Sequence, residues 1–391
     1  MHPVEACTAA SWTPAGTLIQ KVPDGSVFTY LSAAGTTDGF SYTGMVAPYG
    51  DAGPAREVPI VVGRLRAGLA QPPVSPTAAY PRMVALRDGR LRLFWSEPDD
   101  TAHGWSKPFL RTMKSIWYAS YSPEGGWTEP AELVRDSVGI DWGQLGGSLF
   151  QTPDGDVHLT VSSGSVVAGR IVHAVVPRRG KPRVRYFPID GIPSPFTALE
   201  ERGDTLLVAF SVYRLPDPKA PLAVARVQLA QSRNGGGTWT PLDTPVLSAL
   251  PDARTLNFAP TSDGQFHLMV GRTSPASSFV DRYTHLSSPD GGRTWSVRAE
   301  MPVPFAVQEP HLVGDGCGRL HFVFRDTNSR WSKLLYSRWT DGMWSEPVEV
   351  VPGMEVYSLV LSRGDSGLDL IYSTVTSDTT VEVARVRLQP K

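Results

Sequence analysis

The sequence is poor in cysteine and in long hydrophobic runs. Its 391 residues include two cysteines, Cys7 and Cys317, whose wide separation predicts two free thiols rather than a disulfide framework. No apolar run reaches the length that spans a bilayer. Residues Met1 to Trp12 lack the basic and apolar regions of a signal peptide, so we expect none in this form. A cytoplasmic protein and a secreted protein with its signal removed both remain open.

An excess of charge of either sign is also missing. The chain has 37 basic and 38 acidic residues, so its net charge gives no long-range electrostatic attraction to nucleic acid or to an anionic membrane. We therefore expect neither as a partner, and we expect a monomer. Recognition of an anion must depend on a local group of residues.

Helix signals are scarce, because 37 glycines and 35 prolines interrupt the chain. In their place an eight-residue turn motif recurs. It is intact at Ser288 to Trp295, nearly intact at Ser232 to Trp239, and reduced at Ser122 to Trp127 and Ser337 to Trp344. A second phrase, a turn followed by an alternating strand, recurs at Asp88, Asp154, Asp263, Gly318 and Gly367. Self-similarity at roughly fifty residues predicts an all-β, radially repeated fold, a β-propeller.

We expect six four-stranded antiparallel blades, with Asp or Asn turns before the outer strands. Their predicted ranges are Tyr80 to Ser137, Trp142 to Gly191, Pro193 to Leu247, Arg254 to Val303, Phe305 to Gly353, and Met354 to Leu388. The last has three strands, and Val58 to Gly63 is predicted to complete it and close the ring. Residues 1–57 are then an extension with a hairpin around Asp24-Gly25, and 58–391 the propeller. Alternatively, residues 16–46 make a seventh blade.

The turn motif is predicted to serve folding rather than catalysis. Its Asp and Ser or Thr close the turn by hydrogen bonds, its glycines supply positive φ, and its Trp packs between sheets. His158, His267 and His321 occupy the same place in three second strands. Equivalent positions on different blades lie far apart, so we expect packing or hydrogen bonds from these histidines rather than a shared metal.

Chemistry is expected where the inner strands begin, because every blade of a propeller converges there. The polar residues at these places are Arg82, Asp141, Gln144, Arg254, Asn257, Gln308, Glu309, His311, Glu355 and Tyr357, with Glu97, Arg272, Arg325 and Asp326 at strand ends. Arginine recurs among them. Converging guanidiniums grip a planar carboxylate, so an acidic ligand is predicted.

The turn motif resembles the Asp box of the sialidase superfamily, and three further segments are similar to that family. Arg82 to Leu86, followed by Asp88 to Leu91, resembles the segment with the first arginine of a carboxylate-binding triad. Asn328-Ser329-Arg330 resembles the place of the third arginine. Tyr357-Ser358-Leu359, ending in Leu370-Ile371-Tyr372, resembles the segment with the nucleophilic tyrosine. The resemblance covers residues 80–390.

The resemblance implies an exo-glycosidase that releases a terminal sialic acid or a related 2-keto sugar acid with retention, without metal or organic cofactor. The anomeric carboxylate would repel a carboxylate nucleophile, which a neutral tyrosine avoids, and sialidases are for this reason an exception among retaining glycosidases. Tyr357 is then the nucleophile and Asp99 or Asp100 the acid. Arg82, Arg272 and Arg330 form the clamp, and Arg325 and Asn257 are further candidate substrate-binding residues.

The sequence departs from the sialidase pattern at one catalytic position, which leaves the activity open. The glutamate that should activate the tyrosine is missing from Arg254 to Asn257, which leaves Glu309 or Glu355 as substitutes. Without a base, a phenol near its reference pKa of about 10 attacks slowly. A carbohydrate-binding propeller without turnover and a propeller lyase or hydrolase of other specificity are the alternatives. Tyr357 as a structural aromatic in the channel is also open.

Overall fold

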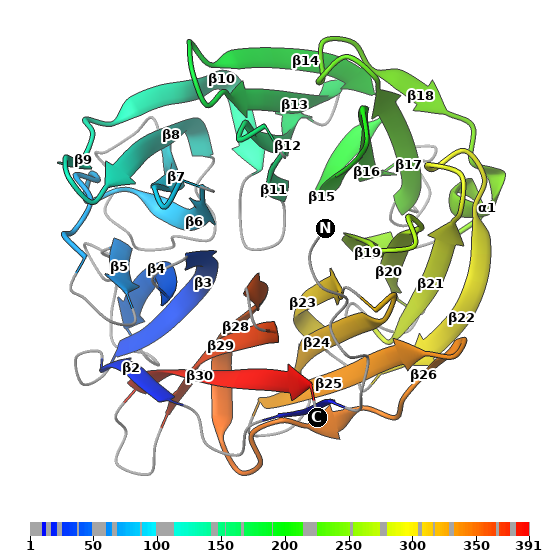
Figure 1. Cartoon of the computed structure of the whole chain (residues 1–391). Coiled ribbons are helices and arrows are strands. Elements are labelled where there is room, and N and C mark those ends of the chain that lie inside the picture. Colours follow the sequence, from blue (N-terminus) through cyan, green and yellow to red (C-terminus); the bar gives the residue numbers. More distant parts are fainter. Residues whose placement is uncertain are drawn as a thin grey trace. The chain divides into compact units, whose positions relative to one another are not determined.

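The structure, a computed structural model, is built almost entirely of β-strands. It describes residues 10–12, 17–21, 26–36, 39–48, 60–64, 69–86, 88–98, 113–141, 148–152, 154–165, 168–189, 191–213, 225–250, 253–273, 280–303, 307–315, 317–327, 332–364, 367–375 and 381–390. Within these ranges the only helix is the single turn α1 (Pro245–Ser248). The strands form six antiparallel sheets with the fold of a β-propeller, as the sequence predicts (Figure 1).

One compact unit comprises residues 1–5, 140–330 and 335–349 and holds four successive repeats. Their strands are β11 Ser148–Gln151, β12 Val157–Ser165, β13 Ala168–Val176 and β14 Arg183–Ile189; β15 Ile192–Arg202, β16 Thr205–Tyr213, β17 Ala225–Ser232 and β18 Thr240–Leu242; β19 Ala253–Pro260, β20 Phe266–Arg272, β21 Arg282–Ser288 and β22 Ser296–Pro302; and β23 Val307–Gly314, β24 Leu320–Asp326, β25 Lys333–Thr340, β26 Met343–Trp344 and β27 Val348–Glu349. These repeats match the predicted ones.

The other unit comprises residues 6–139, 331–334 and 350–391. Its strands are β1 Ala10–Trp12, β2 Thr17–Lys21, β28 Glu355–Gly364, β29 Gly367–Val375 and β30 Val381–Pro390; β3 Ser26–Thr36, β4 Gly39–Pro48 and β5 Ile60–Arg64; and β6 Ala79–Ala85, β7 Leu91–Pro98, β8 Met113–Ser122, β9 Gly126–Trp127 and β10 Ala131–Asp141. Because β10 pairs with both β8 and β12, two predicted repeats share one nine-stranded sheet.

The N-terminal strands differ from the prediction in their partners. Val58 to Gly63 does not complete the last repeat, because β5 pairs with β4, with Ile60 opposite Met45. The place beside β30 is taken instead by β1 and β2, with Trp12 opposite Leu388 and Thr17 opposite Arg385. The strands β3, β4 and β5 form a separate three-stranded sheet, whereas β2 pairs with β30, so residues 16–46 do not form one blade as the alternative interpretation predicts. The hairpin of this sheet joins Thr36 to Gly39, and the predicted turn at Asp24-Gly25 lies outside the described residues.

The cysteine prediction is also wrong. Cys317 is disulfide-bonded, and the chain has only one other cysteine, Cys7, which lies outside the described residues. Two cysteines so far apart in the sequence carry no spacing signal, which is why composition alone favoured free thiols.

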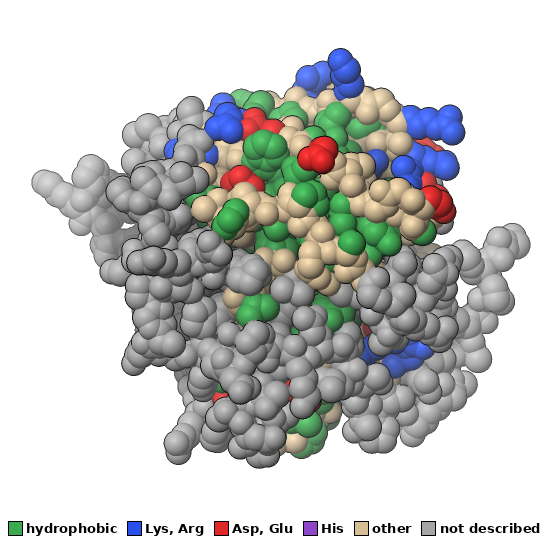
Figure 2. Space-filling model, turned by 90° about the vertical axis from the view of Figure 1, so that its left-hand side faces the viewer, with side chains coloured by type: hydrophobic (Ala, Val, Ile, Leu, Met, Phe, Trp, Pro, Cys, Tyr) green, Lys and Arg blue, Asp and Glu red, His purple; other side chains and the backbone are tan. Residues whose placement is uncertain are grey.

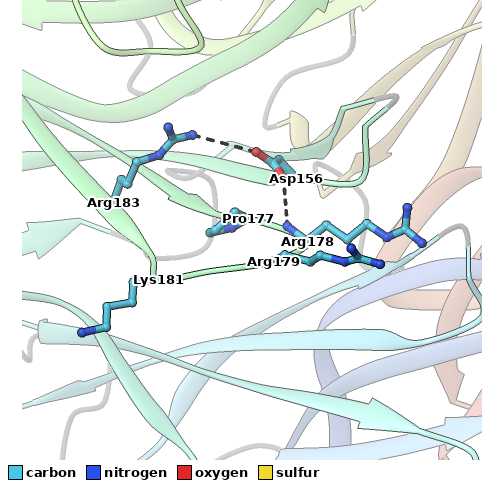
Figure 3. A pocket seen from close by; sticks show the side chains of 6 residues that line it. All are labelled: Asp156, Pro177, Arg178, Arg179, Lys181 and Arg183. Atoms are coloured by element: carbon cyan, nitrogen blue, oxygen red, sulfur yellow. Dashed lines mark hydrogen bonds and ion pairs between the residues drawn. The ribbon is translucent and has the colours of Figure 1, made fainter.

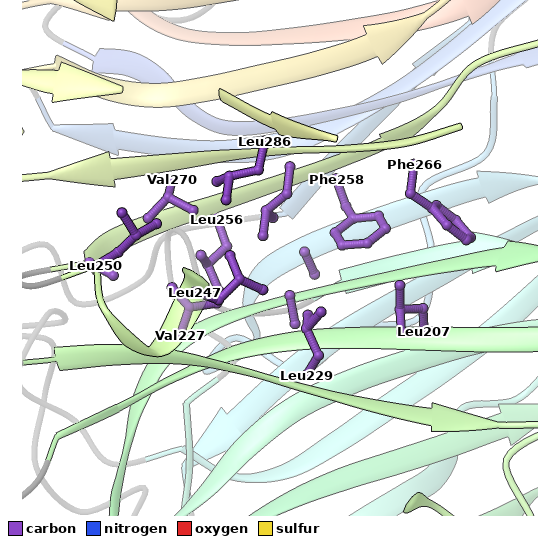
Figure 4. Packing of buried hydrophobic residues seen from close by; sticks show 14 residues of the cluster. Leu207, Val227, Leu229, Leu247, Leu250, Leu256, Phe258, Phe266, Val270 and Leu286 are labelled. Atoms are coloured by element: carbon purple, nitrogen blue, oxygen red, sulfur yellow. The ribbon is translucent and has the colours of Figure 1, made fainter. Parts of the chain in front are cut away.

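Apolar side chains of neighbouring sheets form the core. One cluster joins β15-β16-β17-β18 to β19-β20-β21-β22 and includes Leu207 and Leu229 from the former and Phe266 and Val270 from the latter (Figure 4). Leu247 of α1 is fully buried in the same cluster. Period-2 alternation supplies these residues, since each strand turns every second side chain toward the adjacent sheet.

The Asp-box turns have the predicted hydrogen bonds. The Ser288 hydroxyl donates to Asp290 Oδ1 at 2.9 Å and accepts the Gly292 N–H at 2.8 Å. Asp290 Oδ1 also accepts the N–H of Thr294 at 2.9 Å, and Trp295 packs on the core cluster between the two sheets. In the second copy, Ser232 accepts the Gly236 N–H at 2.9 Å. The motif therefore closes a turn and anchors a tryptophan between sheets.

The second-strand histidines make hydrogen bonds, as predicted, but with the third strand of their own sheet. The nearest ring nitrogens of His158 and His173 are 3.1 Å apart, and those of His267 and His285 are 3.0 Å apart. His321 contacts the hydroxyl of Tyr336 at 2.9 Å instead. Among the described residues no group of three or more His, Cys, Asp or Glu is placed to hold a metal ion.

Gly236 of the second Asp box touches the preceding sheet. Its φ is +82°, and a Cβ added there would clash with the His173 ring, whereas Gly235, at φ +62°, has open space around it. We expect Gly235→Ala to cost about 1 kcal/mol of unfolding free energy from backbone strain alone. Gly236→Ala should cost about 3 kcal/mol or more, because steric overlap is added. Urea denaturation of both variants measures the difference, and equal losses would contradict this contact.

The histidine pairs predict acid sensitivity. Burial lowers the pKa of His158 and His267 to about 4 and that of His173 and His285 to about 3. The unfolded chain therefore binds more protons below about pH 6.5, and stability falls as the pH drops toward 4. Burial raises the pKa of Glu200 to about 8. That single group acts in the opposite direction, because its contribution is lost as the pH rises toward 8.

We expect the unfolding free energy to fall from about pH 7.5 to about pH 5, by up to about 2 kcal/mol for each buried histidine. Denaturant titrations across this range measure the slope. His285→Gln removes one of the four groups and should flatten it. An unchanged slope in that variant would mean that the pair does not stay neutral in the folded protein.

Candidate functional site

Six inner strands have a bulge near their starts, whereas β11 pairs with β12 without one. Register shifts occur between Thr29 and Ser32 in β3, between Ala79 and Arg82 in β6, and between Pro193 and Thr197 in β15. They recur between Ala253 and Thr255 in β19, between Gln308 and His311 in β23, and between Val356 and Ser358 in β28. A bulge redirects side chains and is common beside active sites. The repeated position marks this end of the inner strands as the candidate site.

Two bulges place a non-glycine residue in the left-handed region. Tyr80 has φ +55° and Glu309 has φ +46°, and a proline follows each of them. Such conformations cost on the order of 1–3 kcal/mol and persist where the surroundings enforce them. Both side chains are nearly buried, at 9% and 8% exposure. The sequence analysis predicted Glu309 here but missed Tyr80. Both residues precede a proline at the start of an inner strand, and this shared pattern could have identified Tyr80.

Tyr357 and Arg82 lie on the two inner strands that flank β3. The Ser358 hydroxyl accepts the Leu31 N–H at 3.2 Å, and the Ser32 hydroxyl accepts the Met83 N–H at 2.9 Å. These two bonds join β28 to β3 and β3 to β6 near the bulges of all three strands. Tyr357 precedes Ser358 and Arg82 precedes Met83, so both stand beside a bonded residue. Tyr357 and Arg82 are both half-buried.

Tyr357 occupies the bulge of β28 itself. Its hydroxyl oxygen is shielded from solvent, and Glu355 lies half-buried at the start of the same strand, opposite Val375. A carboxylate and a phenol from one strand end are the residue types of proton transfer followed by attack. The role of Glu355 as a base stays a prediction, and the residue lies in the same unit as Tyr357.

Charged residues gather at one end of β23 and β24. Glu309, Arg325 and Asp326 are each 8% exposed, and Arg325 and Asp326 stand opposite Gln308 and Val307. Charged side chains are seldom buried unless they are paired or serve a site. Asn257, half-buried on β19 opposite Met269, belongs to the preceding sheet.

Arg272 is engaged away from the inner strand. Its guanidinium donates to Glu300 Oε1 at 3.1 Å and to the Thr284 hydroxyl at 3.3 Å. These partners belong to the outer strand β22 and to β21, so the side chain crosses its sheet outward. A role in a carboxylate clamp stays a prediction and would require release of Glu300. Asp99, Asp100 and Arg330 lie outside the described residues.

Comparisons with known proteins identify relatives by fold alone. No protein-family model matches the chain, and no curated protein matches it. Solved structures do: the polysaccharide lyase Uly1 is 12% identical with a TM-score of 0.55, over 95% of this chain and 100% of that one. A protein of unknown function from Dyadobacter fermentans gives 12% identity and a TM-score of 0.51, over 97% and 100%.

A sialidase is similar as well. The Trypanosoma rangeli sialidase in complex with 2,3-difluorosialic acid, as a covalent intermediate, is 12% identical with a TM-score of 0.52. The match covers 97% of this chain and 59% of that one. The resemblance inferred from sequence therefore finds sialidases among the structural neighbours, together with a lyase. No helix in the described residues is long and apolar enough to cross a membrane.

The Ser358 hydroxyl joins β28 to β3 beside Tyr357. Ser358→Ala leaves the Leu31 N–H without its acceptor in a buried place. We expect a loss of about 1–3 kcal/mol in unfolding free energy, the cost of an unsatisfied buried donor. Ser248→Ala, at an exposed position in α1, should change stability by less than about 0.5 kcal/mol. Thermal denaturation of both variants tests this, and equal effects would contradict the bridging role.

Proposed function

We propose that this protein acts on an acidic carbohydrate and releases a terminal sialic acid or a related 2-keto sugar acid with retention of configuration. The observation that carries the proposal is the placement of half-buried Tyr357 and Arg82 on inner strands that flank β3, each beside a bulge. The fold, which is similar to that of a sialidase, is consistent with it.

Tyr357 would attack the anomeric carbon. A phenol carries no charge until it reacts, so it approaches a carbon that bears a carboxylate without repulsion. Its proton must pass to a base as the bond forms. Glu355 is the nearer candidate by sequence and lies on the same strand; Glu309, buried and held at positive φ, is the other. Asp99 or Asp100 would protonate the leaving oxygen.

Arginines would hold the sugar carboxylate. Arg82 is the first of these, because its strand lies in the same unit as Tyr357. Arg330 and Arg272 would complete the clamp, and Arg325 and Asn257 would contact other parts of the sugar. Guanidinium groups suit this task, since they bind a planar carboxylate through two parallel hydrogen bonds.

A second candidate reaction is β-elimination on a uronate polymer. The fold match to a polysaccharide lyase, which spans all of that chain, favours it. An arginine would bind the uronate carboxylate and acidify the adjacent C5–H. A base takes that proton, a C4–C5 double bond forms, and the C4–O bond breaks with a proton delivered to the leaving oxygen. Tyrosine can serve as either proton-transfer group.

Tyr357→Phe should abolish turnover while leaving the fold intact, because only the hydroxyl is lost. We expect a decrease in kcat of about a thousandfold or more on a fluorogenic sialic acid glycoside or the corresponding Kdo glycoside. Tyr118→Phe, a half-buried tyrosine stacked on Phe94, is the matched control and should retain activity. Full activity of Tyr357→Phe would remove this tyrosine from the mechanism.

A second substrate separates the candidate reactions of the wild type. Polymeric uronate is incubated with the wild type, and the ultraviolet absorbance of the unsaturated product is followed. Absorbance growth without release of sialic acid or Kdo would replace hydrolysis by elimination. Binding of sialic acid without turnover of any substrate would leave a carbohydrate-binding propeller.

A further inference from the structure

One sheet has a basic hairpin where other sheets carry an Asp box. After β8, β17, β21 and β25, each the third strand of its repeat, the turn is an intact or reduced Asp box. Between β13 and β14 the chain reads Pro177-Arg178-Arg179-Gly180-Lys181-Pro182. We call residues 177–183 the basic hairpin. Its turn has neither the serine nor the aspartate of an Asp box, so the folding role of that motif does not account for its residues.

The charge around this hairpin is strongly one-sided. From Val157 to Ile189 the sequence has six arginines and lysines and no aspartate or glutamate, although the whole chain is balanced at 37 basic and 38 acidic residues. On the face in Figure 2, Lys and Arg side chains project at the upper edge, and Asp and Glu side chains lie among the hydrophobic and uncharged ones below. Like charges gathered in one hairpin repel one another, so an anion bound there would be stabilised.

The hairpin encloses an open hollow of about 590 Å³. Its lining consists of Asp156, Pro177, Arg178, Arg179, Lys181 and Arg183. The lining thus has four cationic side chains and one carboxylate. Asp156 accepts the backbone N–H of Arg178 at 2.8 Å and lies 3.9 Å from the Arg183 guanidinium. Arg178 and Arg179 extend in the same direction in Figure 3, and Asp156 lies away from their guanidiniums.

The backbone of the hairpin is restricted before any ligand arrives. Pro177 and Pro182 fix two φ angles, and Gly180 makes the turn at φ +97°. Arg178, Arg179, Lys181 and Arg183 are all exposed. A restricted loop loses less entropy on binding, which favours a ligand that spans several cations at once.

We propose that the basic hairpin is a binding surface for an acidic polysaccharide chain, separate from the candidate catalytic site. It lies where β12 begins, which is the end of β12 that pairs with the last residue of the inner strand β11 rather than with its first. The choice of carbohydrate as partner rests on the proposed function. The lining has no aromatic ring on which nucleobases would stack, and no large apolar side chain to enter a membrane. The hollow therefore fits repeated carboxylate or sulfate groups.

The test compares two triple variants of equal charge. Arg178→Ala/Arg179→Ala/Lys181→Ala removes the hairpin cations; Arg233→Ala/Arg293→Ala/Arg298→Ala removes three exposed arginines on or beside Asp boxes. Binding of chondroitin sulfate and of polygalacturonate is measured by calorimetry in low and moderate salt. We expect the first variant to bind at least about tenfold more weakly, with a smaller salt dependence, and the second to bind within about twofold of the wild type.

Equal affinity of the first variant and the wild type, or equal losses in both variants, would overturn the proposal. So would tighter binding of single-stranded DNA or phosphatidylserine vesicles than of the polysaccharides at matched charge. Turnover of a small glycoside should be the same in the hairpin variant as in the wild type. Because binding is measured without turnover, a failure of the proposed catalysis would not be mistaken for a failure of the hairpin.

Discussion

The structure depends on satisfying the backbone amides that become available where the inner strands bulge. A bulge interrupts the ladder of its own sheet, and a buried N–H without an acceptor is costly. Hydroxyls from the neighbouring sheet accept amides at or just after the bulges. Ser358 accepts the N–H of Leu31 within the bulge of β3, and Ser32 accepts that of Met83 just after the bulge of β6. Ser148 accepts that of Leu199, two residues after the bulge of β15, at 2.9 Å. Each sheet in such a pair therefore supports the strand start of the next, and the polar ends of the inner strands are set by bonds between sheets.

This arrangement explains how a repetitive fold carries an irregular site. The bulges repeat in position, but the residues in them differ: Tyr80, Arg254, Glu309 and Tyr357. Near Tyr80 and Tyr357 the hydroxyl bridges to β3 hold the backbone through Met83 and Ser358 and leave the side chain in the bulge open to variation. Strain at Tyr80 and Glu309 is tolerated because packed sheets on either side enforce it. Variation of the reactive groups can therefore proceed without a change in the sheets.

The repeats could be predicted from the sequence, but the pairing partners of the N-terminal strands could not. Asp boxes and alternating strands predicted each repeat from Tyr80 onward, because both are local signals. The partner of Ile60 to Arg64 was predicted wrongly, since period-2 alternation states which face is buried but not which strand lies alongside. Tyr357, Arg82 and Glu309 were found as polar residues at strand starts. Tyr80 was not, because a tyrosine before proline looks like a packing residue until its φ is known.

The third strands of the sheets differ in their surroundings. Some pack a histidine pair against the next sheet, whereas the hairpin after β13 is exposed. His173 lies against Gly236 and Trp239 of the next sheet, with ring centroids of His173 and Trp239 5.2 Å apart. The ring centroids of His285 and Trp339 are 4.4 Å apart. These contacts tie the third strand to the next sheet, and at Gly236 the contact leaves no room for a larger residue. The basic hairpin is exposed instead, and freedom from that constraint allows it to carry cations rather than glycine and serine.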